Sequence, residues 1–172
     1  MPEVVIKLPK CLREVAAKQT QDTLPVRSRN PPKGDKVQAL HMVKNMPSPK
    51  QIKGARGEAL AASMLEEKGY VILERNFRFM KAEVDLIAFL PTPDYSRGGD
   101  LVFIEVKWRR DLDFAVPESA VNAFKKRLMI QAAEAFLHER KLEGTPCRFD
   151  VVAITGKEPN VEIEHLESAF IA

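Results

Sequence analysis

Hydrophobic residues recur at helical spacing in two stretches of the chain, which are separated by short apolar runs. The first stretch runs from Gly54 to Gly69, and the second follows Pro117 and ends near Lys141. In each stretch the apolar positions fall on one face of a helix, and Gly69 is suited to the end of the first. The apolar positions are Ala55, Ala59, Leu60, Ala62, Met64 and Leu65 in the first stretch, and Val121, Phe124, Leu128, Ala132, Ala135 and Phe136 in the second.

The short apolar runs predict β-strands, because they are rich in β-branched and aromatic residues and are bounded by turn-forming residues. They cover residues 70–73, 84–89, 101–108 and 149–154, and the alternating segment 161–166 predicts an additional edge strand. The order is helix, three strands, helix and strand, with one strand more at the end. This order indicates an α/β (α+β) domain with a mixed central sheet and a helix on each face.

The first 52 residues lack this periodicity and differ in charge from the rest. Residues 1–57 hold 12 Lys and Arg against 4 Asp and Glu, and seven of the 12 prolines, whereas residues 58–172 hold 15 against 20. The two parts therefore carry +8 and −5, which gives the net charge of +3. We expect a basic, Pro-rich, largely flexible extension over residues 1–52 and a folded domain over 53–172. Contact with nucleic acid and a merely solvated tail are both open for the extension.

The composition excludes several classes of protein. The chain has 172 residues, of which 45% are apolar and 30% charged, and this is the profile of a globular domain. It contains no run of 18 apolar residues that would predict a membrane-spanning helix. The first residues carry Glu3 and Glu14 and are interrupted by Pro9, unlike a secretory signal. Cys11 and Cys147 are far apart in the sequence, so we expect neither a disulfide framework nor a zinc site. This cysteine usage also favours a cytoplasmic location.

Two acidic residues interrupt the apolar runs that predict the second and third strands. Asp85 lies within residues 84–87, and Glu105 lies within residues 103–106. A charged group in such a run is costly to bury unless it is paired or binds a metal. If the two strands form a hairpin with a loop symmetric about Tyr95, Asp85 lies opposite Glu105 and the two carboxylates repel. A divalent cation between them would turn this repulsion into attraction.

Lys107 completes this group, because side chains two residues apart on a strand share a face. Two carboxylates holding Mg²⁺ or Mn²⁺, with an ammonium group beside them, suit phosphodiester hydrolysis. A structural salt bridge from Lys107 to Glu105 or Asp85 is the alternative interpretation. Glu58, early in the first helix, is a third candidate carboxylate or simply a residue that favours the helix dipole. Glu83 is a secondary ligand candidate, with pairing to a nearby arginine equally open.

Several motifs occur in an order that resembles one protein family. They are GARGE (54–58), GYVILERN (69–76), EVDLIA (83–88), FIEVK (103–107), Lys125 and RFDVV (148–152). From about Gly54 to Phe170 the chain is similar to the YraN-like family (uncharacterised protein family 0102), which is placed in the restriction-endonuclease-like superfamily of PD-(D/E)xK nucleases. More distantly, it is similar to archaeal Holliday-junction resolvases. Two departures from the family pattern are Ala82 and Ala115, where glycine is usual.

The resemblance implies roles for individual residues. Asp85 and Glu105 would be the metal ligands, and Lys107 the catalytic lysine. Glu58 would add a further acid, and Lys125 would face phosphate. All of these roles would serve a helix–three strands–helix–strand nuclease core.

Basic residues near this group are candidates for nucleic-acid contact, and a solvated surface is the alternative for each. Trp108 could stack on a base or be a residue at the edge of the core. The resemblance implies that Arg148, with Asp150, shapes the sheet beside the site. The candidates for nucleic-acid contact are Lys125, Lys126, Arg109, Arg110 and Arg148.

The sequence therefore predicts a bacterial metal-dependent endonuclease-like protein that uses Mg²⁺ or Mn²⁺. Its expected partner is nucleic acid, either DNA or a structured and branched form, and we expect no contact with a membrane. The alternative is a catalytically silent nucleic-acid-binding protein that keeps the fold. The sequence leaves the oligomeric state undecided, and a homodimer is one option.

Overall fold

The computed structural model describes Leu12 and residues 48–91, 98–109 and 121–172. Over these ranges the elements are α3 (Pro49–Glu67), β1 (Val71–Phe79), β2 (Ala82–Pro91), β3 (Gly99–Arg109), α4 (Ala123–Glu139), β4 (Cys147–Lys157) and β5 (Asn160–Phe170). In the described part of the chain, no helix is long and apolar enough to cross a membrane.

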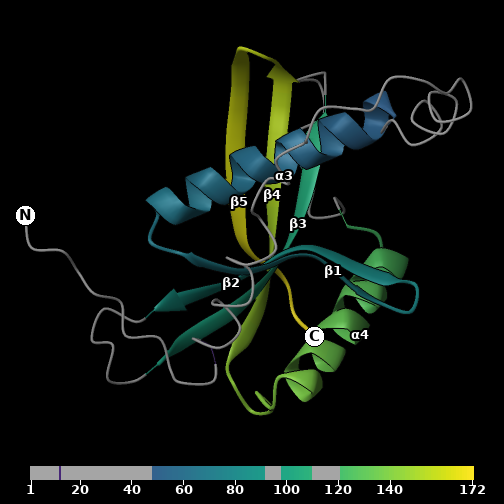
Figure 1. Cartoon of the computed structure of the whole chain (residues 1–172), viewed down its shortest axis with the longest axis vertical. Helices are drawn as coiled ribbons and strands as arrows, with labels where there is room; N and C mark the ends of the chain where they lie inside the picture. The colour runs from purple at the N-terminus through teal and green to yellow at the C-terminus, as the bar shows by residue number, and fades with distance from the viewer. Residues whose placement is uncertain (1–11, 13–47, 92–97, 110–120) are drawn as a thin grey trace, which may run out of the picture.

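The five strands form one mixed sheet in the order β1-β2-β3-β4-β5. Strands β3 and β4 are parallel, and the other neighbours are antiparallel. A parallel pair needs a crossover, and α4 lies in the connection between β3 and β4 (Figure 1). The predicted fold class is confirmed, including β5 at the edge of the sheet.

Two separate hydrophobic clusters show that the helices cover opposite faces of the sheet, as predicted. On one face α3 buries Ala61, Ala62 and Leu65 against residues of β2, β3 and β4. On the other face α4 buries an apolar stripe against β1–β4, in a cluster that includes Phe136. Leu12, only 2% exposed, also belongs to the α4-side cluster.

Of the expected extension over residues 1–52, the structure describes Leu12 and residues 48–52, and the remainder lies outside the described residues.

Helix α3 begins earlier than the sequence pattern predicted. The apolar pattern placed the start of the first helix at Gly54, but Pro49 is the first residue of the helix. Proline is well tolerated there, because the first backbone N–H groups of a helix have no partner within it. The Ser48 hydroxyl accepts from the Gln51 N–H, and the Gln51 side chain accepts from the Ser48 N–H, which forms a capping box.

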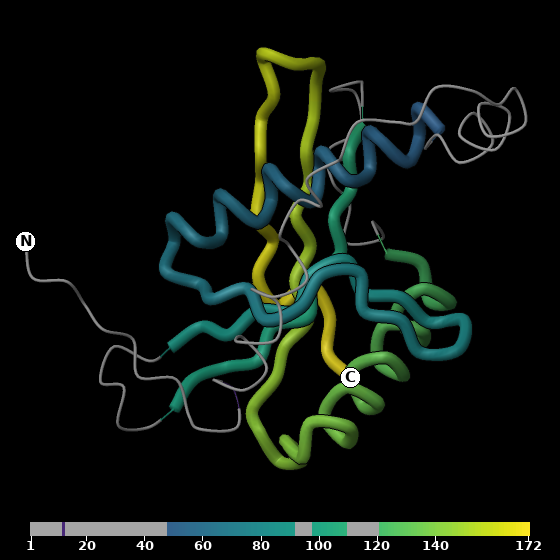
Figure 2. The backbone as a smooth tube through the Cα atoms, in the orientation of Figure 1, coloured from purple at the N-terminus to yellow at the C-terminus, as the bar shows by residue number. Residues whose placement is uncertain are grey.

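Strands β2 and β3 pair along only part of their length, which creates a fork in the sheet. The ladder runs from Pro91–Gly99 to Leu86–Ile104, and this register is the one predicted from a loop symmetric about Tyr95. Beyond the last pair, β2 continues against β1, and β3 continues against β4. The β1–β2 hairpin therefore turns away from β3, β4 and β5 (Figure 2). Asp85 and Glu105 occupy the first positions past the last pair.

Candidate active site

Asp85 is held at this fork by the backbone of the neighbouring strand. The Val106 N–H donates to Oδ2 of Asp85 across 2.7 Å. Because the β2–β3 ladder has ended, the carboxylate takes the place that a strand carbonyl would occupy. The side chain of Asp85 therefore bridges the two strands where they separate.

The surroundings of Asp85 disfavour its charge. The pKa of the Asp85 carboxyl is raised from 3.8 to about 6. Burial is the largest cause of this rise, and the negative charge of Glu105 is the second. The Val106 N–H and the Lys125 ammonium act in the opposite direction, while Glu58 raises the pKa slightly further. Asp85 and Glu105 are therefore close enough to repel one another, as the sequence analysis expected.

Glu105 is almost fully buried, with 2% of its surface exposed, and two lysines neutralise it. Lys107, two residues along β3, donates to Oε1. Nζ of Lys125 forms an ion pair with Oε2 across 2.8 Å. The Lys107–Glu105 salt bridge that the sequence analysis kept as an alternative is therefore present.

Lys125 reaches the carboxylates from the first turn of α4. The helix begins at the N-cap Asn122, whose side chain accepts from the Lys125 N–H at 2.8 Å. The Lys125 ammonium also donates to the Glu83 carbonyl across 3.2 Å. Lys125 thus connects α4, β2 and β3.

Glu58 lies beside this group without joining its ion pairs. Its Oε2 accepts from Nδ2 of Asn76 on β1 across 2.6 Å. Helix α3 approaches β3 closely at Gly57, where a Cβ would lie 3.3 Å from Trp108. Among the residues that the structure describes, no three His, Cys, Asp or Glu side chains form a metal-ligating group. Glu58 is thus a neighbour of the two carboxylates, and its role as a third ligand stays a prediction.

The sequence analysis missed Asn76 as part of this region. Asn76 has a positive φ of 53°, a conformation in which asparagine is several-fold enriched among non-glycine residues. Asn76 follows the predicted strand 70–73 among charged residues, so no local pattern marked it. Glu83, the secondary ligand candidate, instead pairs with Arg78 at 2.9 Å, as the alternative interpretation held.

Arg148 is placed away from the carboxylates. Its guanidinium donates to Asp150 at 3.1 Å and to the Tyr70 hydroxyl at 2.6 Å. Arg148 is in register with Val102, whose side chain belongs to the α3-side cluster, so Arg148 lies on the face of the sheet opposite to Glu105 and about 10 Å along the strand from it. Arg148 therefore supports the sheet and is not brought to the carboxylates.

Asp150 is a second buried carboxylate in an environment opposite to that of Asp85. It accepts from His165 at 2.8 Å and from the Ser168 N–H at 2.9 Å, in addition to Arg148. Burial alone would raise its pKa, but these donors outweigh burial and hold the pKa below its usual value. The ionised form of Asp150 is thus part of the folded structure.

The other basic candidates are dispersed. Arg109 is exposed at the end of β3, beyond Lys107, and Arg110 lies outside the described residues. The Lys126 ammonium lies 5.2 Å from the centre of the Phe170 ring, which places it over the C-terminal end of β5. The fold thus brings Asp85, Glu105, Lys107 and Lys125 together.

Comparison with known proteins identifies the family. The model of the uncharacterised protein family UPF0102 matches residues 57–154. The chain belongs to the UPF0102 family. It is 44% identical over 121 residues to a UPF0102 protein of Geobacter sulfurreducens, covering 70% of this chain and 89% of the relative. It is 38% identical over 117 residues to a UPF0102 protein of Bacteroides fragilis, covering 68% of this chain and 90% of the relative.

The region that matches the UPF0102 model contains the whole group of charged residues at the fork. Glu58 lies at its start, and Asp85, Glu105, Lys107 and Lys125 lie within it. The confirmed resemblance is therefore to the family whose motifs the sequence analysis used.

Proposed function

We propose that this protein is a metal-dependent phosphodiester hydrolase that acts on DNA or structured nucleic acid. The observation that carries the proposal is the fork, where the buried carboxylate of Glu105 and the half-buried carboxylate of Asp85 on adjacent strands meet two ammonium groups. The resemblance to PD-(D/E)xK nucleases supports the same function. From the cysteine usage we also infer a cytoplasmic location.

The carboxylates suit a hard divalent cation. The pKa of Asp85 is raised by burial and by the charge of Glu105. The ionised form of Asp85 is therefore unfavourable in the metal-free protein, and Mg²⁺ or Mn²⁺ bound to oxygen ligands would relieve this cost. Asp85 and Glu105 would hold the cation, and Glu58 is the nearby acid that could add to them.

The remaining residues would bind and orient a phosphodiester. A bound divalent cation would neutralise phosphate charge and lower the pKa of its water. The Lys107 ammonium would leave Oε1 of Glu105 and orient the attacking water or stabilise the charge developing on phosphorus. Lys125, already at the same carboxylate, would face a phosphate oxygen. Both ammonium groups are thus held beside the carboxylates, and Lys107 would need only a local side-chain movement to reach the substrate.

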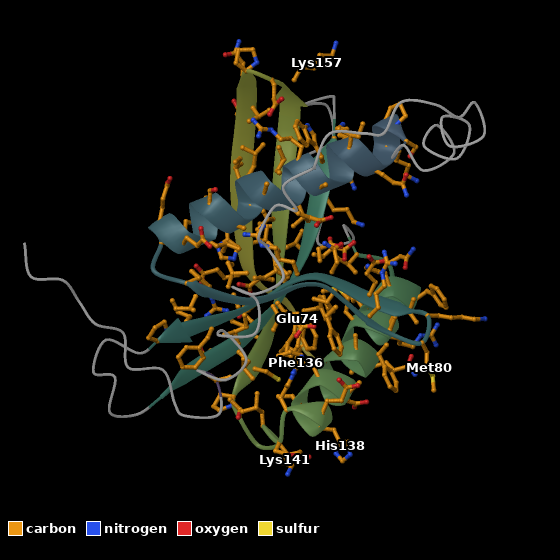
Figure 3. The ribbon with its side chains drawn as sticks, viewed as in Figure 1. Glu74, Met80, Phe136, His138, Lys141 and Lys157 are labelled. Atoms are coloured by element: carbon orange, nitrogen blue, oxygen red, sulfur yellow. The ribbon has the colours of Figure 1, made fainter. Side chains whose placement is uncertain are left out.

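The surface near the fork adds positive charge for nucleic acid. Arg75, Arg78 and Lys81 are exposed on the β1–β2 hairpin, whose tip carries Met80 (Figure 3). Salt-dependent contacts of such residues with phosphates supply most non-specific affinity for nucleic acid. These residues, together with Arg109, would bind the backbone of the substrate.

The experiment is a comparison of metal binding and cleavage in the full chain. Calorimetric titration with Mg²⁺ and Mn²⁺ should detect binding that Asp85→Asn and Glu105→Gln both weaken strongly. A panel of linear, flapped and four-way DNA and RNA substrates then measures cleavage in each metal. Glu83→Gln is the control, because Glu83 pairs with Arg78 and should leave metal affinity unchanged. Unchanged affinity in both carboxylate variants would refute the proposal.

A second candidate function is binding without hydrolysis. It is favoured by the pairing of Glu105 with two lysines, which neutralises the carboxylate without a metal. Lys107→Ala separates the two functions, since one phosphate contact contributes little to an extended nucleic-acid footprint. The variant should lose cleavage while it keeps affinity if the protein is a hydrolase. Loss of affinity with normal cleavage per bound complex would make Lys107 a binding residue.

A further inference from the structure

A surface cavity lies on the α3 side of the sheet, beyond the candidate active site. It has a volume of about 180 Å³, and its walls are formed by Lys53, Trp108, Gly156, Lys157 and Glu158. Pockets for drug-sized ligands occupy roughly 300–1,000 Å³. The cavity is therefore of a size for one small planar group and not for a whole cofactor.

The indole of Trp108 is held in this cavity by Gly156 near the end of β4 and by helix α3 at Gly57. Its Nε1–H donates to the Gly156 carbonyl across 3.0 Å. A Cβ at Gly156 would lie 2.7 Å from the Asn160 carbonyl oxygen, and its φ is +102°, so a glycine is needed at this turn. On the helix side, Gly57 lets α3 approach the ring. Trp108 is thus a preoriented aromatic surface that still contributes to an open cavity.

The charge around the ring is positive. The Lys53 ammonium lies 5.0 Å from the centre of the Trp108 ring, and Lys157 forms another wall of the cavity. Glu158, the acidic member of the lining, already pairs with Arg56 at 2.8 Å. An aromatic face with two ammonium groups beside it is complementary to a planar group that carries a negative charge.

The cavity lies on the opposite face of β3 from Glu105, a short distance along the same strand. Trp108 follows Glu105 by three residues on β3, which is about 10 Å of extended chain. Lys107 and Trp108 alternate to opposite faces near the end of β3, so a strand of nucleic acid crossing that end would meet both.

We propose that this cavity binds an unpaired nucleobase with its attached phosphate, on the single-stranded part of the substrate next to the bond at Asp85 and Glu105. The base stacks on the Trp108 indole, while Lys53 moves from the ring to the phosphate and Lys157 contacts the backbone. A base inside a duplex is already stacked on its neighbours, so the pocket selects substrates with a single-stranded segment. This inference takes its substrate class from the proposed function.

The test uses the fluorescence of Trp108, which is the only tryptophan of the chain. The full-length protein in EDTA is titrated with a single-stranded oligonucleotide, the matching duplex and a nucleoside monophosphate. We expect saturable quenching by the single strand at low concentration and weak quenching by the duplex. The monophosphate should quench only at higher concentration, because it lacks the neighbouring backbone contact. Asp85→Asn should show the same quenching, because the cavity contains no residue of the carboxylate group.

Two further variants measure affinity by the anisotropy of a labelled oligonucleotide. Lys157→Gln should weaken binding and reduce the salt slope by about 0.7 for the lost phosphate contact. Lys141→Gln is the matched control, because this exposed lysine lies at the opposite end of the molecule from Lys157 (Figure 3). Trp108→Leu should weaken binding about 5- to 150-fold. If Trp108→Leu does not fold, the proposal is tested by the affinity of Lys157→Gln and by the quenching of Trp108 in the wild type.

Three results would overturn the proposal. They are binding of the oligonucleotide by anisotropy with no change in Trp108 fluorescence, equal quenching by the single strand and the duplex, and absence of binding by every probe. The proposed hydrolase function is judged separately, by metal titration and cleavage, so a failed cavity leaves that function standing if both are observed.

Discussion

Asp85→Asn should make the metal-free protein more stable at pH values above about 6. The ionised Asp85 is disfavoured in the folded state by burial and by the charge of Glu105, which raise its pKa from 3.8 to about 6. Each pKa unit corresponds to about 1.36 kcal/mol, so ionised Asp85 opposes folding by about 3 kcal/mol. Asparagine removes this charge and keeps an oxygen that can accept from the Val106 N–H.

The effect should depend on pH in a defined direction. A carboxyl with a raised folded-state pKa destabilises the folded protein fully above that pKa, and not at all below its unfolded value. The difference in unfolding free energy between the variant and the wild type should therefore shrink as the pH falls from about 6 to about 4. Urea unfolding followed by far-UV circular dichroism in EDTA, across this range, measures it.

Asp150→Asn is the matched control. It changes a buried aspartate of the same sheet whose surroundings lower the pKa of the carboxyl, whereas those of Asp85 raise it. His165, the Ser168 N–H and Arg148 hold the pKa of Asp150 low, so its ionised form contributes stability that is lost as the pH falls through this lowered pKa. Asp150→Asn should cost about 3 kcal/mol near neutral pH, because it leaves buried partners of the charge unpaired. If Asp85→Asn proves as destabilising as Asp150→Asn near pH 7, the argument that burial and the charge of Glu105 disfavour ionised Asp85 is wrong.

Other predictions concern the lysine at the fork and the core of the α4 side. Lys125→Met should raise the pKa of Asp85 above about 6, because the ammonium lowers it in the wild type, and titration of the carboxyl carbon by NMR measures the shift. An unchanged or lower pKa would mean that Lys125 does not act on Asp85. Phe136→Ala should lower the unfolding free energy by about 3–5 kcal/mol, because the fully buried ring makes edge contacts with Phe77 and Phe103. A loss below about 1 kcal/mol in urea unfolding would show that this cluster is loosely packed.

Most of the fold could be predicted from the sequence, because its helices and strands have strong apolar periodicity. The position of α4 in the parallel crossover follows from the order of the elements. The predicted start of α3 was wrong, since the proline at residue 49 occupies the one place in a helix where it is favourable. Leu12 also could not be assigned to the core, because one apolar residue without periodic neighbours carries no signal of tertiary contact.

The candidate site was only partly predictable, for a different physical reason. Asp85, Glu105 and Lys107 could be grouped from strand alternation and one assumed register, both of which are local rules. Lys125 was identified by resemblance, and its contacts with Glu105 and Glu83 depend on where α4 begins and how it packs.

The amino-acid pattern was enough to place most elements and to mark acidic residues within apolar strands, because these features depend on neighbours in the chain and on the cost of burying charge. The register of the β2–β3 hairpin had to be assumed, and the structure established it. Only the folded domain shows that β2 and β3 separate at Asp85, that Val106 donates to its carboxylate, and that Arg148 supports the sheet away from the site. It also created the cavity at Trp108 from α3, β3 and the β4–β5 turn. Such contacts join distant segments, and their geometry is set by packing of the whole domain, which no local pattern records.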